Sequence, residues 1–170
     1  MTPDLLTQLL NQLLGCACEC LNARSWCPCP CRTFISAGAP VWDLEACCTD
    51  GQLTIHVERL FVHGNFPSEQ GEVNVCVAPL AADINITLLR CFPGVRDDGS
   101  APTADELGAA SEKLYQDLYV LTRCIICNLA SRGRQQKAVF RGSRILDPQG
   151  GCAGVEVRFT IELPDPLPFQ

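Results

Sequence analysis

The stretch that decides the fold of this chain runs Val155-Glu156-Val157-Arg158-Phe159-Thr160-Ile161-Glu162-Leu163. Large apolar residues occupy every second position, and charged or hydroxyl-bearing residues occupy the positions between them. Successive side chains of a β-strand point to opposite faces of its sheet. The stretch therefore predicts a strand with one face on a hydrophobic core and the other face toward water or a neighbouring protein.

Four earlier segments also have the pattern of strands, at Gln52–His63, Val73–Val77, Asp83–Phe92 and Ala138–Leu146. The first of these is expected to divide its side chains between two faces, with Leu53, Ile55, Val57 and Phe61 on one and Thr54, His56 and Glu58 on the other. Leu60 and Val62 fall on the second face, so the far half of this strand is expected to be covered on both sides or bulged. Residues 147–151 have the composition of a turn before the last strand.

Two segments have helical periodicity. The first begins at Thr2-Pro3-Asp4, where a capping hydroxyl, a proline and an acidic residue stand together. We expect it to end at Asn22 and the proline-rich stretch Cys27–Cys31. Its apolar stripe consists of Leu5, Leu6, Leu9, Leu10, Leu13, Leu14 and Ala17.

The second helix is longer and follows a loop from Pro93 to Pro102. Thr103 and Glu106 match the capping box, in which a hydroxyl and a carboxylate bind each other's backbone amides, and Gly133 is expected to end the helix. Two neighbouring apolar stripes predict burial against the sheet and against a second element or subunit. They consist of Leu107, Ala110, Leu114, Leu118, Leu121, Ile125 and Leu129, and of Tyr115, Tyr119, Thr122 and Ile126.

The order of these elements predicts an α+β fold, in which an antiparallel or mixed β-sheet packs with an N-terminal helix and one long helix. We expect one domain over residues 1–170, because no internal repeat or linker interrupts the chain. Its parts are a cysteine-rich helix and loop over 1–49, the sheet with the long helix over 50–163, and a proline-rich tail over 164–170.

The composition predicts a globular protein that is acidic overall. Hydrophobic residues make up 47% of the chain, charged residues make up 19%, and the formal net charge is -6. Binding to nucleic-acid phosphates needs clustered lysine and arginine, and the nearest group, from Arg132 to Arg144, is more simply a solvated edge. No apolar run reaches the roughly 18 residues of a membrane span. The first residues lack the positive charge of a secretion signal, so we expect folding in a cytoplasm.

The sequence contains no motif of a known catalytic or cofactor site, so we expect neither an enzyme nor a bound cofactor. His56 and His63 lie on one predicted strand and are expected on opposite faces, as ordinary surface or rim residues. Asp97 and Asp98 stand beside Gly99 in a loop, where a solvated turn accounts for them.

The chain contains 13 cysteines, many of them near its start. Three states are open for the N-terminal group: packed thiols, disulfide bonds, or a metal site, although the one-residue spacing fits a zinc ribbon poorly. Disulfides, if formed, are expected to join the first helix, the proline-rich loop and the Cys47-Cys48 pair. The set is Cys16, Cys18, Cys20, Cys27, Cys29, Cys31, Cys47 and Cys48. Cys124 and Cys127 have the spacing of a redox motif, but their place late in an apolar helix favours buried thiols.

Four segments carry a resemblance to a known family: Asp50-Gly51-Gln52-Leu53, Ile86-Thr87-Leu88-Leu89-Arg90-Cys91-Phe92-Pro93, Pro102-Thr103-Ala104-Asp105-Glu106-Leu107 and Pro148-Gln149-Gly150-Gly151-Cys152-Ala153-Gly154. With these segments, and with a cysteine-rich start that includes Trp42-Asp43, the chain resembles the tail terminator proteins of actinobacteriophages. Other neck proteins, the head-tail stopper and the tail tube, share similar folds and are alternatives. A cysteine-based metal-binding or redox module and a host-factor-binding protein are alternatives from other classes.

The resemblance implies a structural virion protein that forms a six-fold ring on the last ring of the tail tube. Such a ring ends tube polymerisation and presents its other face to the head-tail connector or stopper protein. The implied partners are copies of this chain, the tail tube protein and the connector, and the implied location is the virion neck after assembly in the host bacterial cytoplasm. DNA would pass through the lumen without sequence-specific binding. Six copies at a net charge of -6 would carry about -36, which suits a conduit to which DNA must not adhere.

The residues expected to act are interface residues, and no catalytic or metal-binding set is predicted. On the last strand, Glu156, Arg158 and Glu162 are predicted to be exposed and to pair between subunits. The loop from residue 95 to residue 101 is predicted to contact the neighbouring ring, because loops on a rigid scaffold carry recognition. The candidate interface residues in this loop are Val95, Arg96, Asp97 and Asp98. For both sets a solvated surface without a partner is the alternative.

Overall fold

The computed structural model describes residues 5–24, 26–40, 42, 51–70, 78–132 and 137–163. Over these ranges the chain forms a mixed six-stranded sheet with an N-terminal helix and one long helix, which is the predicted α+β class. The elements are α1 (Leu5–Arg24), β1 (Arg32–Ile35), β2 (Gln52–Asn65), β3 (Ser68–Glu69), β4 (Leu80–Cys91), α3 (Ala104–Arg132), β5 (Ala138–Gln149) and β6 (Cys152–Glu162).

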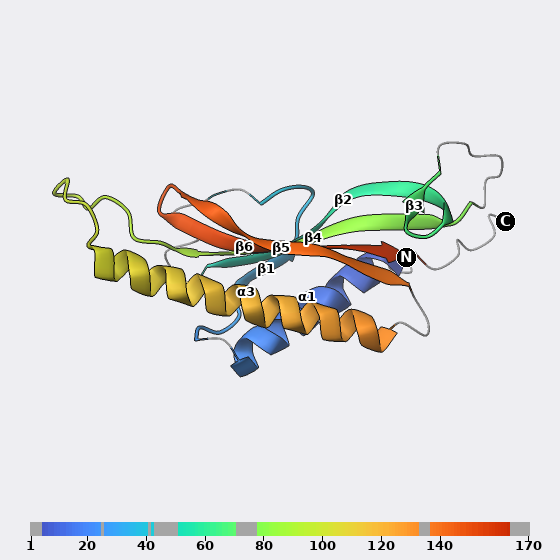
Figure 1. The fold of residues 1–170 in the computed structure, drawn as a ribbon, viewed down its shortest axis with the longest axis horizontal. Coiled ribbons are helices and arrows are strands. Elements are labelled where there is room, and N and C mark those ends of the chain that lie inside the picture. Colours follow the sequence, from blue (N-terminus) through green and yellow to red (C-terminus); the bar gives the residue numbers. More distant parts are fainter. Residues whose placement is uncertain are drawn as a thin grey trace.

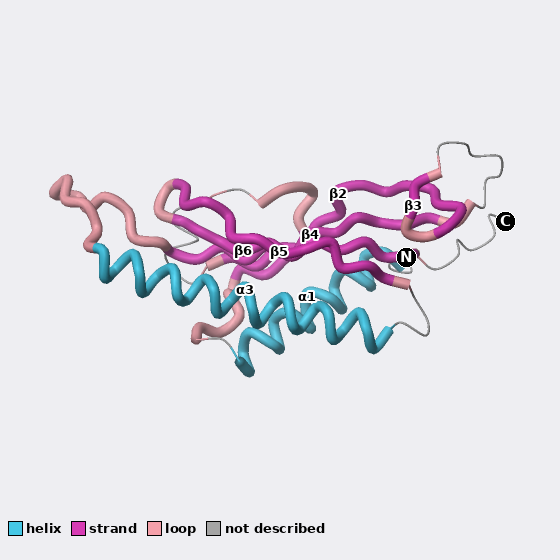
Figure 2. The backbone as a smooth tube through the Cα atoms, viewed as in Figure 1, coloured by secondary structure: helices cyan, strands magenta, loops and turns pink. Residues whose placement is uncertain are grey.

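The sheet is open and carries both helices on one face. Its strands lie in the order β1-β2-β4-β6-β5, and β3 pairs with the far end of β2. β1 runs parallel to β2, whereas β4, β6 and β5 follow one another in antiparallel pairs. In Figure 1, α1 and α3 lie below the sheet, and Figure 2 shows the same two layers. Neither of these two helices is long and apolar enough to cross a membrane.

The core lies between the helices and the central strands. β4 is buried along nearly its whole length, because β2 and β6 flank it and the helices cover one face. The helices contribute Leu9, Leu10, Leu13, Leu14, Ala17, Leu21, Leu114, Leu121, Ile125 and Leu129. The strands contribute alternate residues, among them Leu53, Ile55, Ile84, Ile86, Leu88, Val155, Val157, Phe159 and Ile161. Burial of one such side chain stabilises the fold by about 1.5–3 kcal/mol, so this apolar contact holds the two layers together.

A β-bulge in β2 changes which of its residues share a face. The register with β4 shifts between Val57 and Arg59, so Glu58 is an extra residue on β2. One extra residue inverts the alternation of every side chain after it. Of the two arrangements expected for the far half of this strand, the bulge is present, and the faces predicted for the residues beyond it are wrong. Leu60 and Val62 share the face of Leu53, and Phe61 lies on the opposite face.

Several boundaries differ from the sequence prediction. β1 was not predicted, because four residues are too few for a periodic signal and the strand depends on parallel pairing with β2. α1 continues past Asn22 to Arg24, and β5 extends through Asp147 into the predicted turn. Other predicted features lie outside the described residues: Thr2-Pro3-Asp4, Cys47-Cys48, Val73–Val77, Gly133 and the tail over 164–170.

Close packing of β4 against β6 depends on Gly154. A Cβ atom at this position would lie 2.5 Å from the Leu88 carbonyl oxygen and 2.6 Å from Leu89 Cδ2. Real Cβ atoms do not approach backbone oxygens so closely, so a larger residue would force the two strands apart.

We expect Gly154→Ala to lower the free energy of unfolding by about 1–3 kcal/mol, because the backbone of β4 must shift. The control is Gly108→Ala in α3, where an added methyl group meets nothing within 4 Å. Alanine favours a helix over glycine by roughly 0.5–1 kcal/mol, so the control should be slightly stabilised. Urea denaturation measures both, and unchanged stability of Gly154→Ala would contradict the close approach.

Candidate functional site

Arg90 is a buried cation at the end of β4, on the face that the helices cover. Its side chain is 4% exposed, and its Nε donates to Oδ2 of Asp117, a fully buried residue of α3, at 3.2 Å. Other N–H groups of Arg90 donate to the carbonyl oxygens of Cys27 at 3.2 Å and Pro28 at 3.1 Å. The Trp26 ring lies 5.5 Å from the guanidinium carbon. One side chain thus joins β4, α3 and the proline-rich stretch after α1.

This buried pair was not predicted from the sequence, although the position of each partner in its apolar pattern indicates burial. Arg90 continues the alternation of Ile86 and Leu88, so its side chain points to the core face of β4. Asp117 follows Leu114 by three residues and lies on the buried side of α3. Each residue is a charged side chain within an otherwise apolar stripe, and the two charges have opposite signs. Because an unpaired buried charge is too costly, this pattern indicates a buried ion pair.

Three other segments meet at this end of the sheet (Figure 1). Gly51, just before β2, has φ of 84°, and a Cβ there would lie 2.5 Å from the Leu89 carbonyl oxygen. The amide of Phe92 donates to the Gly151 carbonyl oxygen at 2.7 Å, which joins the end of β4 to the β5–β6 turn. The start of β2, the end of β4 and the β5–β6 turn therefore form one packed end beside Arg90.

The start of α3 lies at the same end and has the predicted capping box. The Thr103 amide donates to Glu106 Oε2 at 2.8 Å, and the Glu106 amide donates to Thr103 Oγ1 at 3.2 Å. Arg96 adds two hydrogen bonds of 2.7 Å to the same carboxylate. The bonds from Thr103, and then that from Arg96, lower the pKa of Glu106 below its ordinary value.

The predicted contact loop extends beyond this packed end (Figure 1). Val95 in this loop is 74% exposed, and Asp97 is exposed as well. Within the loop the Ser100 amide donates to Asp98 Oδ1 at 2.8 Å, and the hydrogen bonds with Ser100 lower the pKa of Asp98. Arg96 anchors the loop to α3 through Glu106, so the exposed side chain of Val95 belongs to a loop with fixed contacts.

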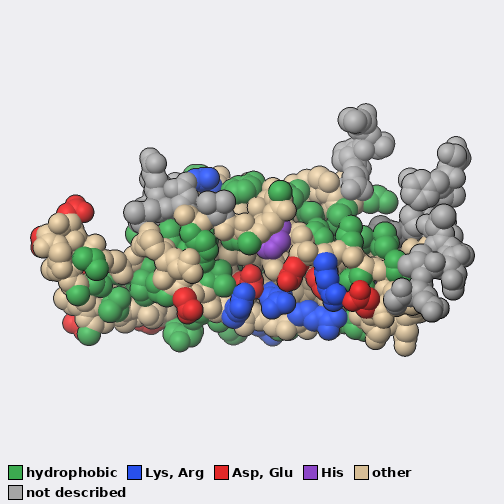
Figure 3. Space-filling model, turned by 90° about the horizontal axis from the view of Figure 1, so that it is seen from above, with side chains coloured by type: hydrophobic (Ala, Val, Ile, Leu, Met, Phe, Trp, Pro, Cys, Tyr) green, Lys and Arg blue, Asp and Glu red, His purple; other side chains and the backbone are tan. Residues whose placement is uncertain are grey.

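Positively and negatively charged side chains gather on the sheet face opposite the helices (Figure 3), where they pair between neighbouring strands. Asp83 on β4 accepts hydrogen bonds from Arg59 Nε, at 2.6 Å, and from the Thr160 hydroxyl. Arg141 on β5 donates to Thr160 Oγ1 at 2.7 Å. Burial alone would raise the pKa of Asp83, but the bonds from Thr160 and Arg59 outweigh it and lower the pKa.

The predicted interface residues of β6 already have partners within the chain. Glu156 is buried and accepts a 2.9 Å bond from Arg144, so the prediction that it is exposed is wrong. The reason is that β6 lies inside the sheet, with β5 covering its side. Arg158 is exposed and lies 3.7 Å from Glu58. Glu162 is partly buried and contacts Lys137 at 3.3 Å. Pairing of these residues between subunits stays a prediction.

His56 and His63 differ from their prediction in two respects. The bulge places both on the same face of β2, not on opposite faces, and both are buried rather than at the surface. Asn85 Nδ2 lies 3.5 Å from His56 Nε2. Burial lowers the pKa of His56, and the nearby carboxylates of Glu156 and Glu58 oppose this effect without cancelling it.

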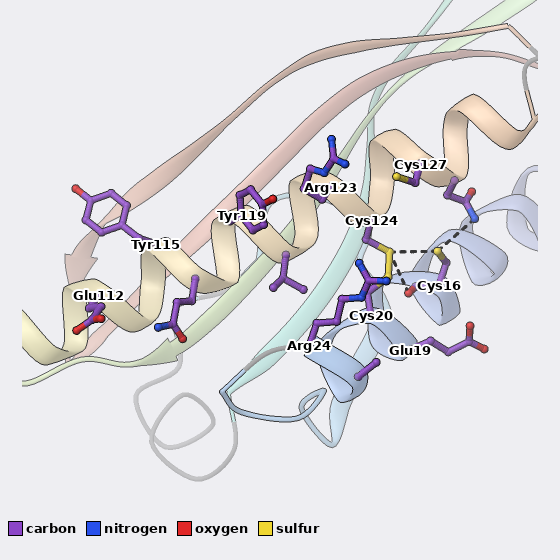
Figure 4. A pocket seen from close by; sticks show the side chains of 14 residues that line it. Cys16, Glu19, Cys20, Arg24, Glu112, Tyr115, Tyr119, Arg123, Cys124 and Cys127 are labelled. Atoms are coloured by element: carbon purple, nitrogen blue, oxygen red, sulfur yellow. Dashed lines mark hydrogen bonds between the residues drawn. A yellow bond between two sulfur atoms is a disulfide. The ribbon is translucent and has the colours of Figure 1, made fainter.

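A groove of about 960 Å³ lies between α1 and α3 (Figure 4). The exposed rings of Tyr115 and Tyr119 form part of its wall, together with Arg24 and Arg123. The second apolar stripe predicted for α3 is therefore divided, because its two tyrosines line this groove while Thr122 donates to Ser143 of β5 at 2.9 Å.

Cysteines lie along α1 and at the groove. Disulfide bonds join Cys18 to Cys29 of the proline-rich stretch and Cys20 to Cys124 of α3. The interpretation of Cys124 as a packed thiol is wrong, because the crossing of the two helices brings Cys20 beside it. Cys152 is disulfide-bonded as well. Among the other described cysteines, thiols remain at Cys16, Cys27, Cys31, Cys91 and Cys127.

No model of a known protein family matches the chain, and no curated protein matches its sequence. Similarity to characterised proteins therefore assigns no activity to the Arg90 pair, to the charged sheet face or to the helix groove. Their possible roles follow from their geometry and chemistry.

We expect Asp117→Asn to lower the free energy of unfolding by about 3–5 kcal/mol, because among the described residues Asp117 is the acidic partner of the buried Arg90. The matched control is Arg96→Gln, which breaks an exposed pair with Glu106 and should cost less than about 1 kcal/mol. Thermal and urea unfolding would measure both. Equal, small losses for the two variants would mean that Asp117 does not compensate a buried charge.

We expect the protein to lose stability as the pH falls below 6.5, the ordinary pKa of histidine. The folded state holds the pKa of His56 below this value, so the unfolded chain binds the proton first and is favoured as the pH decreases. His56→Gln should reduce this pH dependence, whereas His63→Gln should leave the contribution of His56 in place. Urea midpoints between pH 8 and pH 5 test this, and identical pH dependence in wild type and His56→Gln would contradict it.

Proposed function

We propose that this chain is a structural protein of a bacteriophage particle, the tail terminator that closes the end of the tail tube. The observation that carries the proposal is the placement of the four segments on which the family resemblance rests. Far apart in the sequence, their described residues lie together at one end of the molecule: Gly51–Leu53, Ile86–Pro93, Pro102–Leu107 and Pro148–Gly154.

Each of the four segments contributes to the packing of that end of the molecule. Gly51 allows the chain to approach β4, and the Phe92 amide bonds to the β5–β6 turn. The capping box at Thr103 starts α3, and Arg90 joins this helix to β4 through Asp117. Together these segments build a rigid base for the exposed loop around Val95. A rigid base with a projecting loop suits a surface that docks onto another ring of protein.

The two edges of the sheet support assembly into a ring. Among the described residues β5 pairs with a strand on one side only, and Phe140 on it is 38% exposed. At the opposite edge, β2 continues beyond its pairing with β1, and Leu60 there is 51% exposed. Both side chains point to the helix-covered face of the sheet. Two different apolar edges on one chain favour head-to-tail contacts, which close into a ring when the rotation between subunits allows it.

The proposed ring would be hexameric and would bind the tail tube protein on one face and the head-tail connector on the other. Its location would be the neck of the virion, after assembly in the cytoplasm of the host. The sheet face opposite the helices carries Arg59, Arg141, Arg144 and Arg158 beside Glu58, Asp83 and Glu156. This mixed face is not the acidic wall expected of the DNA conduit, so another surface would have to supply that wall.

A tail tube protein and a head-tail stopper are the alternatives within the same assembly. A tube protein would polymerise alone into long tubes, and a stopper would bind filled heads in preference to tube ends. The terminator alone should form single rings that bind only at the ends of preformed tubes.

We expect the purified full-length protein to form rings that cap tail tubes in negative-stain electron microscopy. Phe140→Asp should shift the protein to monomers in size-exclusion chromatography with light scattering, because a buried charge at the subunit contact is costly. Val95→Asp should keep the ring but weaken its binding to tubes, because the loop lies at the packed end rather than on a sheet edge.

Two results would contradict this proposal. One is a wild-type protein that stays monomeric and leaves tube ends open at concentrations where tubes are stable. The other is a Val95→Asp variant that does not form rings while Phe140→Asp still does. The loop, and not the edge of β5, would then make the contact between subunits. Circular dichroism of both variants controls for unfolding.

A further inference from the structure

Three cysteine sulfur atoms meet where α1 crosses α3. Cys16 and Cys20 are four residues apart on α1 and therefore lie on one side of that helix. Cys124 comes from α3, and the three Sγ atoms all lie within 4.8 Å of one another. Figure 4 shows them at the groove, with Cys127 further along α3. The cluster unites residues more than one hundred positions apart, so only the helix crossing creates it.

We propose that this cluster, when its sulfurs are reduced, is a binding site for a thiophilic divalent cation such as Zn²⁺. Zinc in proteins is tetrahedral with Zn–S distances of about 2.3 Å, which places two ligating sulfurs about 3.8 Å apart. Cys16 Sγ and Cys124 Sγ are 3.4 Å apart. Three sulfurs this close need only small side-chain rotations to share one ion. A water molecule from the groove would complete the fourth position.

The surroundings of the cluster suit thiolate ligands. Three thiolates and one Zn²⁺ leave a net charge of about −1. Asn128 Nδ2 donates to Cys16 Sγ at 3.2 Å, and hydrogen bonds of this kind orient ligands and stabilise their charge. Two cations, Arg24 and Arg123, and two acids, Glu19 and Glu112, line the same groove, so its own side chains are balanced in charge.

The disulfide bond and the metal site exclude each other, because Cys20 and Cys124 serve both. A thiol reductant supplies two electrons and two protons and converts the disulfide to two thiols. Zn²⁺ then displaces one proton from each thiol that it binds. In either state a link joins α1 to α3, so the site keeps the helix layer together in reducing and in oxidising surroundings. This inference goes beyond the proposed function and does not depend on ring assembly.

Cys16→Ser is the sharpest test, because Cys16 takes part in the cluster but not in a disulfide bond. The full-length protein would be reduced, freed of metal and titrated with Zn²⁺ by calorimetry, and with Cd²⁺ by thiolate-to-metal absorption. We expect one high-affinity ion per chain at this site, and a loss of affinity of about 100-fold or more in Cys16→Ser. Cys31→Ser and Cys91→Ser remove exposed thiols elsewhere and should bind as the wild type does.

Oxidised wild type and oxidised Cys16→Ser should have the same unfolding temperature, which separates loss of the metal site from loss of the fold. Zinc should also protect Cys16, Cys20 and Cys124 from alkylation, as read by mass spectrometry, and leave Cys91 reactive. Full zinc affinity in Cys16→Ser, or no zinc binding by the reduced wild type at micromolar concentrations, would overturn the proposal. Ring formation is measured in a separate experiment. A failure to form rings would therefore not be mistaken for a failure to bind zinc.

Discussion

The buried pair of Arg90 and Asp117 is the constraint on which the rest of the structure depends. Both groups lie in the layer between sheet and helices, where an isolated charge would be too costly to keep. Arg90 therefore needs Asp117 together with the carbonyl oxygens of Cys27 and Pro28. These contacts set where α3 lies against β4 and hold the proline-rich stretch at the end of the sheet. The apolar contacts supply most of the stabilisation but little of this positional specificity.

The second organising feature is the difference between the two faces of the sheet. The helices cover one face, and the other presents charged side chains, of which Asp83 and Glu156 are held by Arg59, Thr160 and Arg144. These charged residues pair within the chain, and Leu89 and Cys152 on the same face pack with Trp42 and Leu146. The edge strands differ, because their apolar side chains are exposed and their outer hydrogen-bonding groups face away from the sheet. Assembly through the edges is therefore better supported than assembly through the face.

The cysteines link the helices in a way that depends on whether the surroundings are oxidising or reducing. Cys18 forms a disulfide bond with Cys29, which links α1 to the segment that leads into β1. Cys20 forms a disulfide bond with Cys124, which links α1 to α3. Cys16 lies beside the second link. A chain that folds under reducing conditions and then functions outside a cell would need α1 held in both environments. A sulfur cluster that can hold either a disulfide or a metal ion meets that need.

The sequence by itself determined the fold class, both helices, the capping box at Thr103 and the main strands, because apolar periodicity and local hydrogen-bonding groups act over a few residues. It did not determine β1, whose four residues depend on β2, or the faces beyond the bulge at Glu58, which depend on the register with β4. Arg90 and Asp117 stood in apolar stripes, but only the packing of α3 on β4 paired them. The partners of Cys20 and Glu156 were decided in the same way, since contacts between residues distant in sequence depend on how whole elements cross.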